Sequence, residues 1–343
     1  MSVDLPEPYG AWIQAAAGAI PSESRVNCLD CTMCDPATTR ATVTFDATMK
    51  CCTYLPEIPN FLVGRILSDD TPANAQGRAS VVRRIEDGAG VTPLLLGRSA
   101  PVAARFDAAG EYMGVRTDLA CPHLDGEGGC GIRPHRHAVC ATWFCKHERG
   151  AEGQELWALI RELLLAVEHE LSVWAAMQEG LSDAALRMCL GTPGAERVVP
   201  DRGASRAPWW GDLLGDELGF YERCAGRVAG LDWDDVLRIT GPVVSARASV
   251  VRQRAEAYRQ PTVPARLAVG QHSVIAVGVH GTLVRTHSPF DPLGLPAALV
   301  SVLHYFDGRP TAEVLEQLHT ERGVVIADDL LRHLLDWRVL REG

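Results

Sequence analysis

The 343-residue sequence predicts an α+β protein that is mainly α-helical and is organised in three parts. Residues 1–150 are rich in Gly, Pro, Asp and Thr and contain only short apolar runs, which is typical of loops. Residues 151–262 carry apolar side chains at intervals of three and four residues, which is the helical period. Residues 263–343 combine two runs of β-forming residues with three helical patterns. Each part is therefore expected to form a domain.

The first part, residues 1–150, has too few apolar residues to form a core unaided, and its cysteines indicate what holds it together. Nine of the eleven cysteines lie here, within the first 145 residues: Cys28, Cys31, Cys34, Cys51, Cys52, Cys121, Cys130, Cys140 and Cys145. Two thiolates spaced as C-x2-C in a tight turn converge on one ion, as in zinc and iron-sulfur sites. The sequence therefore predicts that these nine thiols are metal ligands and that this loop-rich module folds around metal.

The second part, residues 151–262, is predicted to be a helical domain. Within residues 154–177, apolar side chains recur on one helical face: Leu156, Ile160, Leu163, Val167, Leu171 and Trp174. Further helices are predicted over residues 212–230 and 233–260. Cys189 and Cys224 lie alone in helical patterns, so both are predicted to be small buried hydrophobic residues rather than ligands.

The third part, residues 263–343, begins where prolines interrupt the helical pattern. Residues 273–286 form two β-type runs around His280-Gly281, which predicts a hairpin. Three helices are predicted next, over residues 295–308, 311–323 and 327–340, and Gly308 and Gly323 close the first two. A hairpin, three helices and a short terminal strand make a winged-helix-like module.

The charge balance argues against polyanionic partners. There are 33 Lys and Arg against 43 Asp and Glu, a formal net charge of −10, which repels nucleic acid and anionic lipid. No apolar run approaches the roughly 20 residues that a membrane-spanning helix requires. The N-terminal sequence has no basic region followed by an apolar core, so a cytoplasmic location is expected. In that reducing compartment the cysteines are not expected to form disulfides.

Several other side chains near the cysteines are candidate metal ligands or catalytic groups. Four histidines crowd the last cysteines, namely His123, His135, His137 and His147, and each is either a metal ligand or an ordinary loop residue. Three acidic residues, Asp118, Asp125 and Glu127, are predicted to be turn residues. The sequence contains no phosphate-binding loop, no H-E-x-x-H pair and no G-x-S-x-G motif. No catalytic residue is therefore identified, and whether the protein is an enzyme stays open.

The second half of the cysteine region carries a recognisable pattern of spacings. It consists of Cys121-Pro122 with Leu124, Cys130 with Ile132, Arg136 before Cys140, and Cys145. Over about residues 28–147 the chain thereby resembles the YkgJ-like cysteine-cluster family, which implies a zinc- or iron-chelating domain. The chain departs from the family's C-x2-C-x2-C-C opening, because Asp35 follows Cys34. His137 also stands where the family usually has proline.

Nine thiols exceed the four that one tetrahedral site uses, so either two sites or one site with spare thiols fits the sequence. The related flagellin lysine methylase family, which has a similar cysteine pattern, is linked to an iron-sulfur cluster, and this resemblance favours iron-sulfur over zinc. Zinc stays the alternative, because Thr38 stands where the C-x2-C-x2-C-x3-C-P ferredoxin run needs its fourth cysteine. The C-x3-C-x2-C radical signature is also absent.

The third part, residues 263–343, resembles PqqD-like domains. The likeness rests on the hairpin, on the stretch ALVSVLHYFDGRPTAEVLEQL and on the final LLDWRVL. It implies that this part captures an extended peptide by strand addition. The alternative is a closing domain that binds nothing. DNA binding is disfavoured, because the last predicted helix has three Asp and one Arg.

Together these patterns predict a metal-binding cysteine-cluster protein that serves as an accessory or modifying component acting on a peptide or protein. Two alternatives are an iron-sulfur redox enzyme or protein methylase, and a metal- or redox-sensing winged-helix regulator. Adjacent side chains on an extended chain point to opposite faces, so Cys51 and Cys52 are expected to serve different roles. Residues 263–343 contain no clustered ligands, so their deletion is expected to leave the metal bound.

Overall fold

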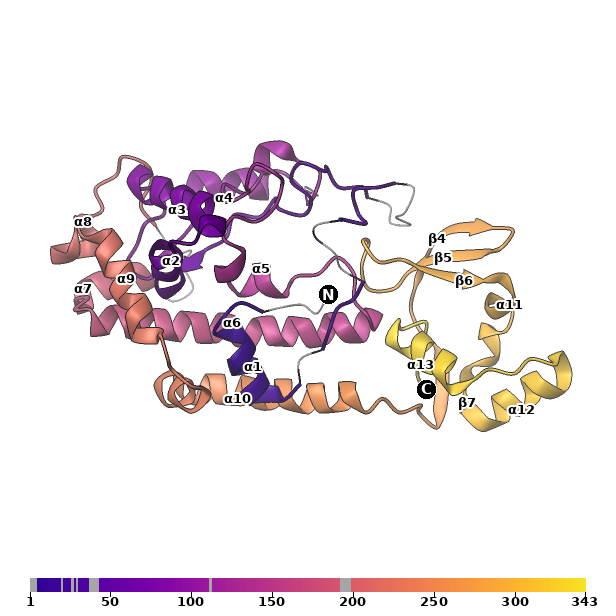
Figure 1. Cartoon of the computed structure of the whole chain (residues 1–343). Helices are drawn as coiled ribbons and strands as arrows, with labels where there is room; N and C mark the ends of the chain where they lie inside the picture. The colour runs from indigo at the N-terminus through magenta and orange to yellow at the C-terminus, as the bar shows by residue number, and fades with distance from the viewer. Residues whose placement is uncertain are drawn as a thin grey trace.

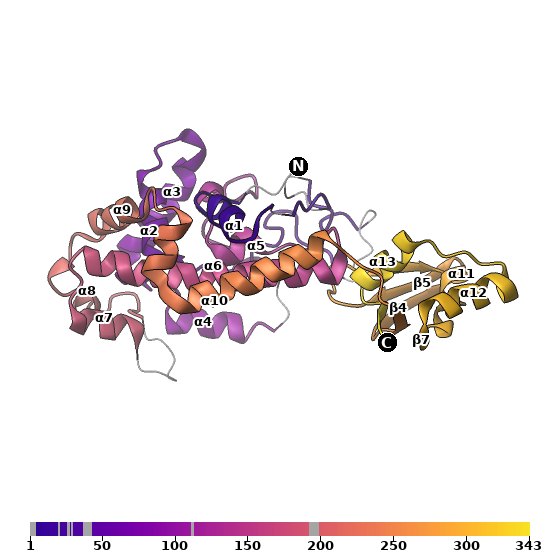
Figure 2. The same cartoon turned by 90° about the horizontal axis from the view of Figure 1, so that it is seen from below.

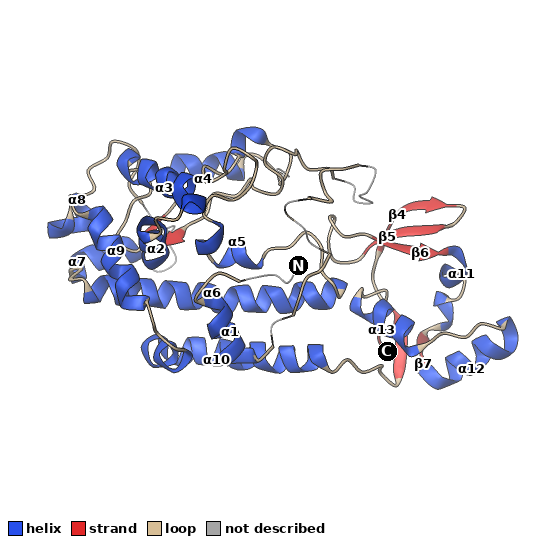
Figure 3. Cartoon of the chain, in the orientation of Figure 1, coloured by secondary structure: helices blue, strands red, loops and turns tan. Residues whose placement is uncertain are grey.

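The structure is a computed structural model that describes residues 5–19, 21–25, 28, 30–36, 43–110, 113–191 and 199–343 (Figure 1). About 51% of the chain is helix and 10% is strand, which confirms the mainly α, α+β class. Figure 3 shows that strands are concentrated in the C-terminal part, whereas helices and loops make up nearly all the rest. No helix in the described ranges is long and apolar enough to cross a membrane.

The longer helices are α1 (Tyr9–Ala17), α2 (Asn60–Ser68), α3 (Ala75–Asp87), α4 (Ala100–Asp107), α6 (Gly150–Gln178), α7 (Asp183–Leu190), α9 (Glu217–Val228), α10 (Trp233–Arg259), α12 (Thr311–Arg322) and α13 (Asp328–Asp336). The short helices are α5 (Ala138–Thr142), α8 (Ala207–Trp210) and α11 (Ala297–Val300). The strands are β1 (Ile58–Pro59), β2 (Leu95–Leu96), β3 (Arg266–Val269), β4 (Ser273–Gly278), β5 (Gly281–Arg285), β6 (Leu293–Pro296), β7 (Asp307–Pro310) and β8 (Leu340–Glu342).

Two long helices, α6 and α10, form the spine of the molecule and run side by side in opposite directions (Figures 1 and 2). The structure confirms the helix predicted over residues 154–177, whose apolar face is buried. The second long helix, α10, contains a kink where the sequence predicts an unbroken helix over residues 233–260. Gly241 has a φ of 73° and Pro242 follows it, so the helical hydrogen bonding of α10 is broken there.

One continuous hydrophobic core joins the first part of the chain to the middle helices. It extends from Tyr9 in α1 to Ala255 in α10. The expectation of a loop-dominated first part is wrong for residues 58–107, where α2, α3 and α4 form. The apolar run of α2 packs against α9 so closely that a β-carbon on Gly64 would lie 1.9 Å from the carbonyl oxygen of Tyr221. Glycine is therefore required at this crossing.

The C-terminal part has a core of its own, formed by residues between Leu267 and Leu340. It contains two antiparallel sheets, with strand orders β7-β3-β8 and β4-β5-β6. The predicted hairpin is confirmed, because β4 and β5 pair from Ser273↔Arg285 to Gly278↔Gly281. The helices predicted over residues 311–323 and 327–340 correspond to α12 and α13. Over residues 295–308 the helical elements are the short α11 and a 3₁₀ turn, and the two ends of this range belong to β6 and β7. The helix is therefore shorter than predicted.

Candidate functional site

Five of the nine candidate ligands lie together and make up what we call the first thiol group: Cys28, Cys31, Cys34, Cys51 and Cys145. Cys31 and Cys34 share a turn, in which the amide of Cys34 donates to the carbonyl of Cys31 over 3.0 Å. A small hydrophobic cluster brings this turn to Cys145, and Cys51 also packs against it. The fold therefore gathers thiols that lie more than one hundred residues apart in the sequence.

The thiols of the first group affect one another's ionisation. Burial raises the pKa of Cys145 to about 12, and the thiols of Cys31 and Cys28 add to the rise. Burial also raises the pKa of Cys34 to about 11, with a further contribution from its hydrogen bond to Cys31. Such effects act over short distances, so these side chains are neighbours in space.

The other four candidate ligands make up the second thiol group: Cys52, Cys121, Cys130 and Cys140. The amide of Cys121 donates to the carbonyl of Cys52 over 2.8 Å, which joins two distant segments. Burial raises the pKa of Cys121 to about 12, and Cys52 and Cys130 contribute to the rise. Burial likewise raises the pKa of Cys140 well above its usual value, and Cys121 and Cys130 contribute.

Local turns hold the thiols of the second group in place. Leu124 and Cys130 form an isolated antiparallel bridge. The Asp125 carboxylate closes the loop between them by accepting hydrogen bonds from the amides of Glu127 at 2.9 Å and Gly129 at 2.6 Å. Asp125 is therefore a turn residue, as predicted.

Three charged residues support the two groups: Glu168, Arg136 and Asp291. Of these, only Arg136 belongs to the cysteine pattern described in the sequence. Glu168, buried on α6, accepts hydrogen bonds from the amide of Ala138 at 2.7 Å and from the Tyr9 hydroxyl, so it fixes α5 and with it Cys140. Burial raises the pKa of Cys130 and of Cys140, and the positive charge of Arg136 opposes this rise; the same charge adds to the lowering of the pKa of Cys52. A lone Glu in an apolar helical face was the only sequence signal for Glu168.

The boundary between the two groups falls at the Cys51-Cys52 peptide bond. The chain turns sharply there, because Lys50 has a φ of 55° and the amide of Thr53 donates to the carbonyl of Cys51 over 2.9 Å. The Cys51 thiol lies near Cys28 and Cys145 and donates a hydrogen bond to the Cys52 sulfur. This hydrogen bond, with help from Arg136, lowers the pKa of Cys52 to about 7. The two thiols are therefore close enough to affect each other's pKa, yet each belongs to a different group.

The thiols are neighbours but do not form a finished coordination shell. Among the described residues, no three Cys, His, Asp or Glu side chains are placed so that they could hold one metal ion. The two remaining cysteines behave as predicted, since Cys189 on α7 and Cys224 on α9 are buried in the main core.

The four histidines near the cysteines differ in their partners. Arg84 donates to Nε2 of His123 over 3.0 Å, so Nδ1 of this ring carries the proton and donates to the Ser80 hydroxyl. Nε2 of His135 pairs with the Asp69 carboxylate over 2.7 Å. His137 has no hydrogen-bond partner at either ring nitrogen among the described residues, although it is only 2% exposed.

The fourth histidine, His147, lies where the C-terminal part meets the first thiol group. The Asp291 side chain is fully buried there and accepts two hydrogen bonds from Arg25, at 2.8 and 2.7 Å, and one from the amide of His147 at 3.3 Å. Arg25 and His147 are three and two residues from Cys28 and Cys145. The loop that joins β5 to β6 is therefore tied to both ends of the first thiol group. No local pattern around Asp291 signals this contact.

Aromatic side chains complete the same junction. The ring of Phe290 lies 5.4 Å from that of Phe45 and 5.9 Å from that of Trp143, between centroids. Both rings belong to the hydrophobic cluster of the first thiol group. Lys146 donates to the carbonyl of Phe290 over 3.1 Å. The C-terminal part thus covers one side of this group.

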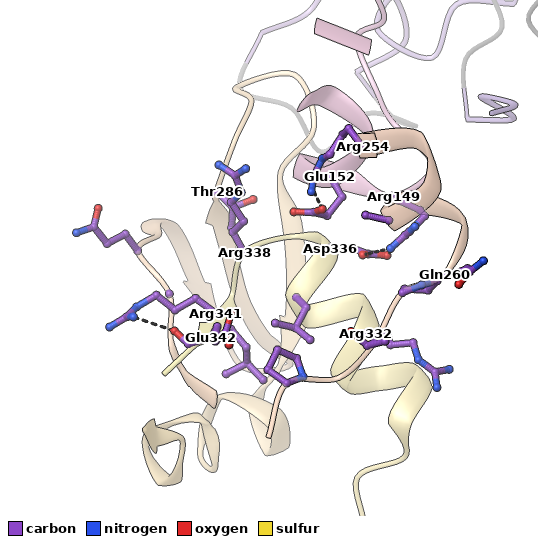
Figure 4. Close-up of a pocket in the computed structure, with 18 residues that line it drawn as sticks. Arg149, Glu152, Arg254, Gln260, Thr286, Arg332, Asp336, Arg338, Arg341 and Glu342 are labelled. Atoms are coloured by element: carbon purple, nitrogen blue, oxygen red, sulfur yellow. Dashed lines mark hydrogen bonds and ion pairs between the residues drawn. The ribbon is translucent and has the colours of Figure 1, made fainter. Parts of the chain in front are cut away.

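A cavity of about 820 Å³ lies nearby, between the ends of α6 and α10 and the C-terminal α13 and β8 (Figure 4). Arg149 pairs with Asp336 across it at 2.6 Å, and Arg254 pairs with Glu152. The residues that line this cavity include no cysteine or histidine. Arg149, Arg254, Arg332 and Arg338 pair with carboxylates, and Arg341 donates to the backbone carbonyl of Glu342. The cavity is therefore a polar junction between the helical and C-terminal parts.

Comparison with known proteins gives no further constraint. No family model, no curated protein and no solved structure matches this chain. A functional conclusion therefore has to come from the residues themselves.

Proposed function

We propose that this chain is a metal-binding cysteine-cluster protein with two thiolate sites, one in each thiol group, and that it acts on a peptide or protein partner. The observation that carries the proposal is the division of the nine thiols into two groups that meet at the Cys51-Cys52 peptide bond. Each group contains at least four thiols, the number that a tetrahedral zinc ion or an iron-sulfur cluster takes.

The support for a metal comes from the kind and number of the donors, because thiolates are the ligands that zinc and iron-sulfur clusters take, and not from a finished coordination geometry among the described residues. The proposed ligands of the first group are Cys28, Cys31, Cys51 and Cys145. Cys34 would be a spare thiol, because Cys31 is the one thiol that affects its pKa. In the second group all four thiols would be ligands, with Arg136 offsetting their negative charge. An iron-sulfur cluster, favoured by the family resemblance, would supply electron transfer, whereas zinc would supply structure.

The C-terminal part is the proposed binding site for the partner. In the sheet β4-β5-β6, β4 pairs only with β5 among the described strands, so one edge of this sheet is free to add a strand. Val274 and Val277 on β4 are 59% and 77% exposed. An extended peptide with apolar side chains fits this edge, which agrees with the resemblance to PqqD-like domains. A DNA-binding regulator is disfavoured, because α13 carries three Asp and one Arg.

A redox role is the second candidate function. The observation that favours it is the coupling between the adjacent Cys51 and Cys52 thiols, since two metal centres that each took one of these thiols would lie next to each other. If both centres are iron-sulfur clusters, an electron could pass between them. A protein methylase would need a cosubstrate site as well, and no feature of the described residues indicates one.

Cysteine substitutions test whether there are two sites. The full-length protein is purified without oxygen, and its metal and acid-labile sulfide are measured per chain. Cys51→Ser is expected to remove about half of the metal, and adding Cys145→Ser should remove no more. Adding Cys140→Ser to Cys51→Ser should remove the rest, because the losses of independent sites add. Cys189→Ala is the control and should keep all of the metal.

The proposal fails if the wild-type protein binds no metal under these conditions. It also fails if Cys51→Ser alone removes all of the metal, because the two groups would then share one centre. Iron with acid-labile sulfide would identify iron-sulfur clusters, whereas stoichiometric zinc without sulfide would identify two structural sites.

A further inference from the structure

We infer that His137 is a nitrogen ligand of the metal in the second thiol group, so that this site combines thiolates with an imidazole. The inference rests on the proposed function. It goes further by distinguishing the two sites from each other, because His137 is the histidine, among the described residues, whose two ring nitrogens are both buried without a hydrogen-bond partner.

The first argument is the burial of His137 without partners. His137 is 2% exposed, and neither Nδ1 nor Nε2 of its ring has a hydrogen-bond partner among the described residues. A buried imidazole normally uses at least one nitrogen in a hydrogen bond, because leaving both unpaired forfeits the hydration of two polar atoms. A metal ion is a partner that would bind one of these nitrogens.

The second argument is the position of His137 relative to the thiols. It is the residue that precedes α5, and Cys140 is the third residue of that helix. The His137 ring makes no capping hydrogen bond to this helix, so neither ring nitrogen is used there. The His137 ring also stacks on Tyr54, with centroids 5.9 Å apart and an angle of 22° between the planes. Tyr54 is two residues from Cys52, so His137 is held between the segments that carry Cys52 and Cys140.

The other histidines serve as a comparison. His123 uses both ring nitrogens, with Ser80 and Arg84, and His135 is paired with Asp69. Nδ1 of His147 is also buried without a hydrogen-bond partner, but this ring lies beside His287 at the junction with the C-terminal part. His137 is therefore the histidine whose environment in the second thiol group points to a ligand.

Five donors exceed the four that one tetrahedral ion uses. One donor of the second site can then exchange with an atom of a substrate or partner, whereas the first site can stay closed. If the centre is an iron-sulfur cluster, replacing a thiolate by imidazole also raises its reduction potential. The second site is accordingly the one suited to chemistry.

The test uses Co²⁺ as the metal probe in the full-length protein. The background is Cys51→Ser with Cys145→Ser, which leaves only the second site to bind metal. In this background, His137→Ala is expected to lower Co²⁺ affinity at least tenfold and to shift the visible d–d bands, because a ligand is lost. His135→Ala, which removes an equally buried histidine with a protein partner, should change neither.

A third variant guards against a loss of folding. His137→Cys supplies a thiolate at the same place and should restore affinity while strengthening the sulfur-to-cobalt charge-transfer band. The inference is overturned if His137→Ala gives the same affinity and spectrum as His135→Ala, or if His137→Cys leaves the charge-transfer band unchanged. Absence of Co²⁺ binding in the background protein itself would instead overturn the proposal of a second thiolate site.

Discussion

The thiols of Cys51 and Cys52 ionise differently although the two residues are adjacent in the chain. The hydrogen bond from Cys51 is the largest cause of the lowered pKa of Cys52, and Arg136 and Lys50 add to it. With a pKa of about 7, Cys52 is largely thiolate above neutral pH, and the thiolate is the form that binds metal and reacts with alkylating agents.

This difference predicts a reactivity that can be measured in the reduced, metal-free protein. At pH 7, Cys52 should react with iodoacetamide faster than an ordinary thiol, and Cys51→Ala should slow this reaction several-fold because the pKa of Cys52 rises. Peptide mass spectrometry gives the rate at Cys52. Cys34→Ala, which removes a thiol from the same region, is the control. An unchanged rate in Cys51→Ala would show that the hydrogen bond does not set the pKa.

Among the helices, the sequence predicts long apolar patterns well and short ones poorly. The apolar face of α6 repeats over several turns, so its prediction was correct. The helices α2, α3 and α4 span 9, 13 and 8 residues, and their patterns are too short to be distinguished from loops. Tertiary contacts stabilise them: α2 packs on α9 and α6, α3 packs on α2, and Phe106 of α4 packs with Leu55 and Leu119. No local pattern reveals these contacts.

The packing of α2 on α9 leads to a prediction at the level of these elements. Gly64→Ala should lower the free energy of unfolding by about 1–3 kcal/mol or more, because the new β-carbon meets the backbone of Tyr221. Gly226→Ala on α9 is the matched control. Its β-carbon would meet nothing within 4 Å, so it should stabilise the helix slightly. Urea denaturation measures both, and equal effects would contradict the packing described here.

The link between α6 and α5 should depend on pH. Burial raises the pKa of Glu168 to about 7, so the folded protein holds a proton that the unfolded chain releases from about pH 4.5. The contribution of Glu168 to stability is therefore full below about pH 4.5 and falls as the pH rises to 7. The fall is on the order of 3 kcal/mol from a pKa shift of this size.

Glu168→Gln keeps a hydrogen-bond acceptor for the amide of Ala138 but cannot ionise. It should flatten the decline of urea stability between pH 5 and pH 7. Part of the slope will persist, since burial also raises the pKa of Glu23 to about 7. A slope identical to that of the wild-type protein would show that Glu168 does not titrate in this range.

For the whole molecule, the sequence predicted the nine candidate ligands but not how the fold divides them. Spacing reveals local pairs such as Cys31 and Cys34. The proximity of Cys51 to Cys145, and of Cys52 to Cys140, depends on contacts between segments about ninety residues apart. His137 likewise differs from the other histidines in its lack of hydrogen-bond partners, and this difference depends on which side chains the fold brings near each ring. Such long-range contacts leave no local trace in a single sequence.

The junction with the C-terminal part also changes one expectation. The sequence contains no clustered ligands after residue 262, so deletion of residues 263–343 was expected to leave all of the metal bound. In the structure, Phe290 and Asp291 cover and tie down the first thiol group. We now predict that metal is lost from the first site and kept at the second.

Asp291→Asn tests this link with a smaller change. It leaves Arg25 without its buried counter-ion and should weaken metal binding at the first site, while the second site keeps its metal. Asp307→Asn, at an exposed ion pair of the C-terminal part, is the control and should change neither site. Equal metal content in the wild-type and Asp291→Asn proteins would show that the loop between β5 and β6 has no part in the first site.

The most direct test of the two-site account is native mass spectrometry of the full-length protein, purified without oxygen. The wild-type chain should carry two metal centres. Cys51→Ser and Cys52→Ser should each carry one, and the chain with both substitutions should carry none. A single centre in the wild-type chain, lost completely on either substitution, would contradict the division of the thiols at the Cys51-Cys52 peptide bond.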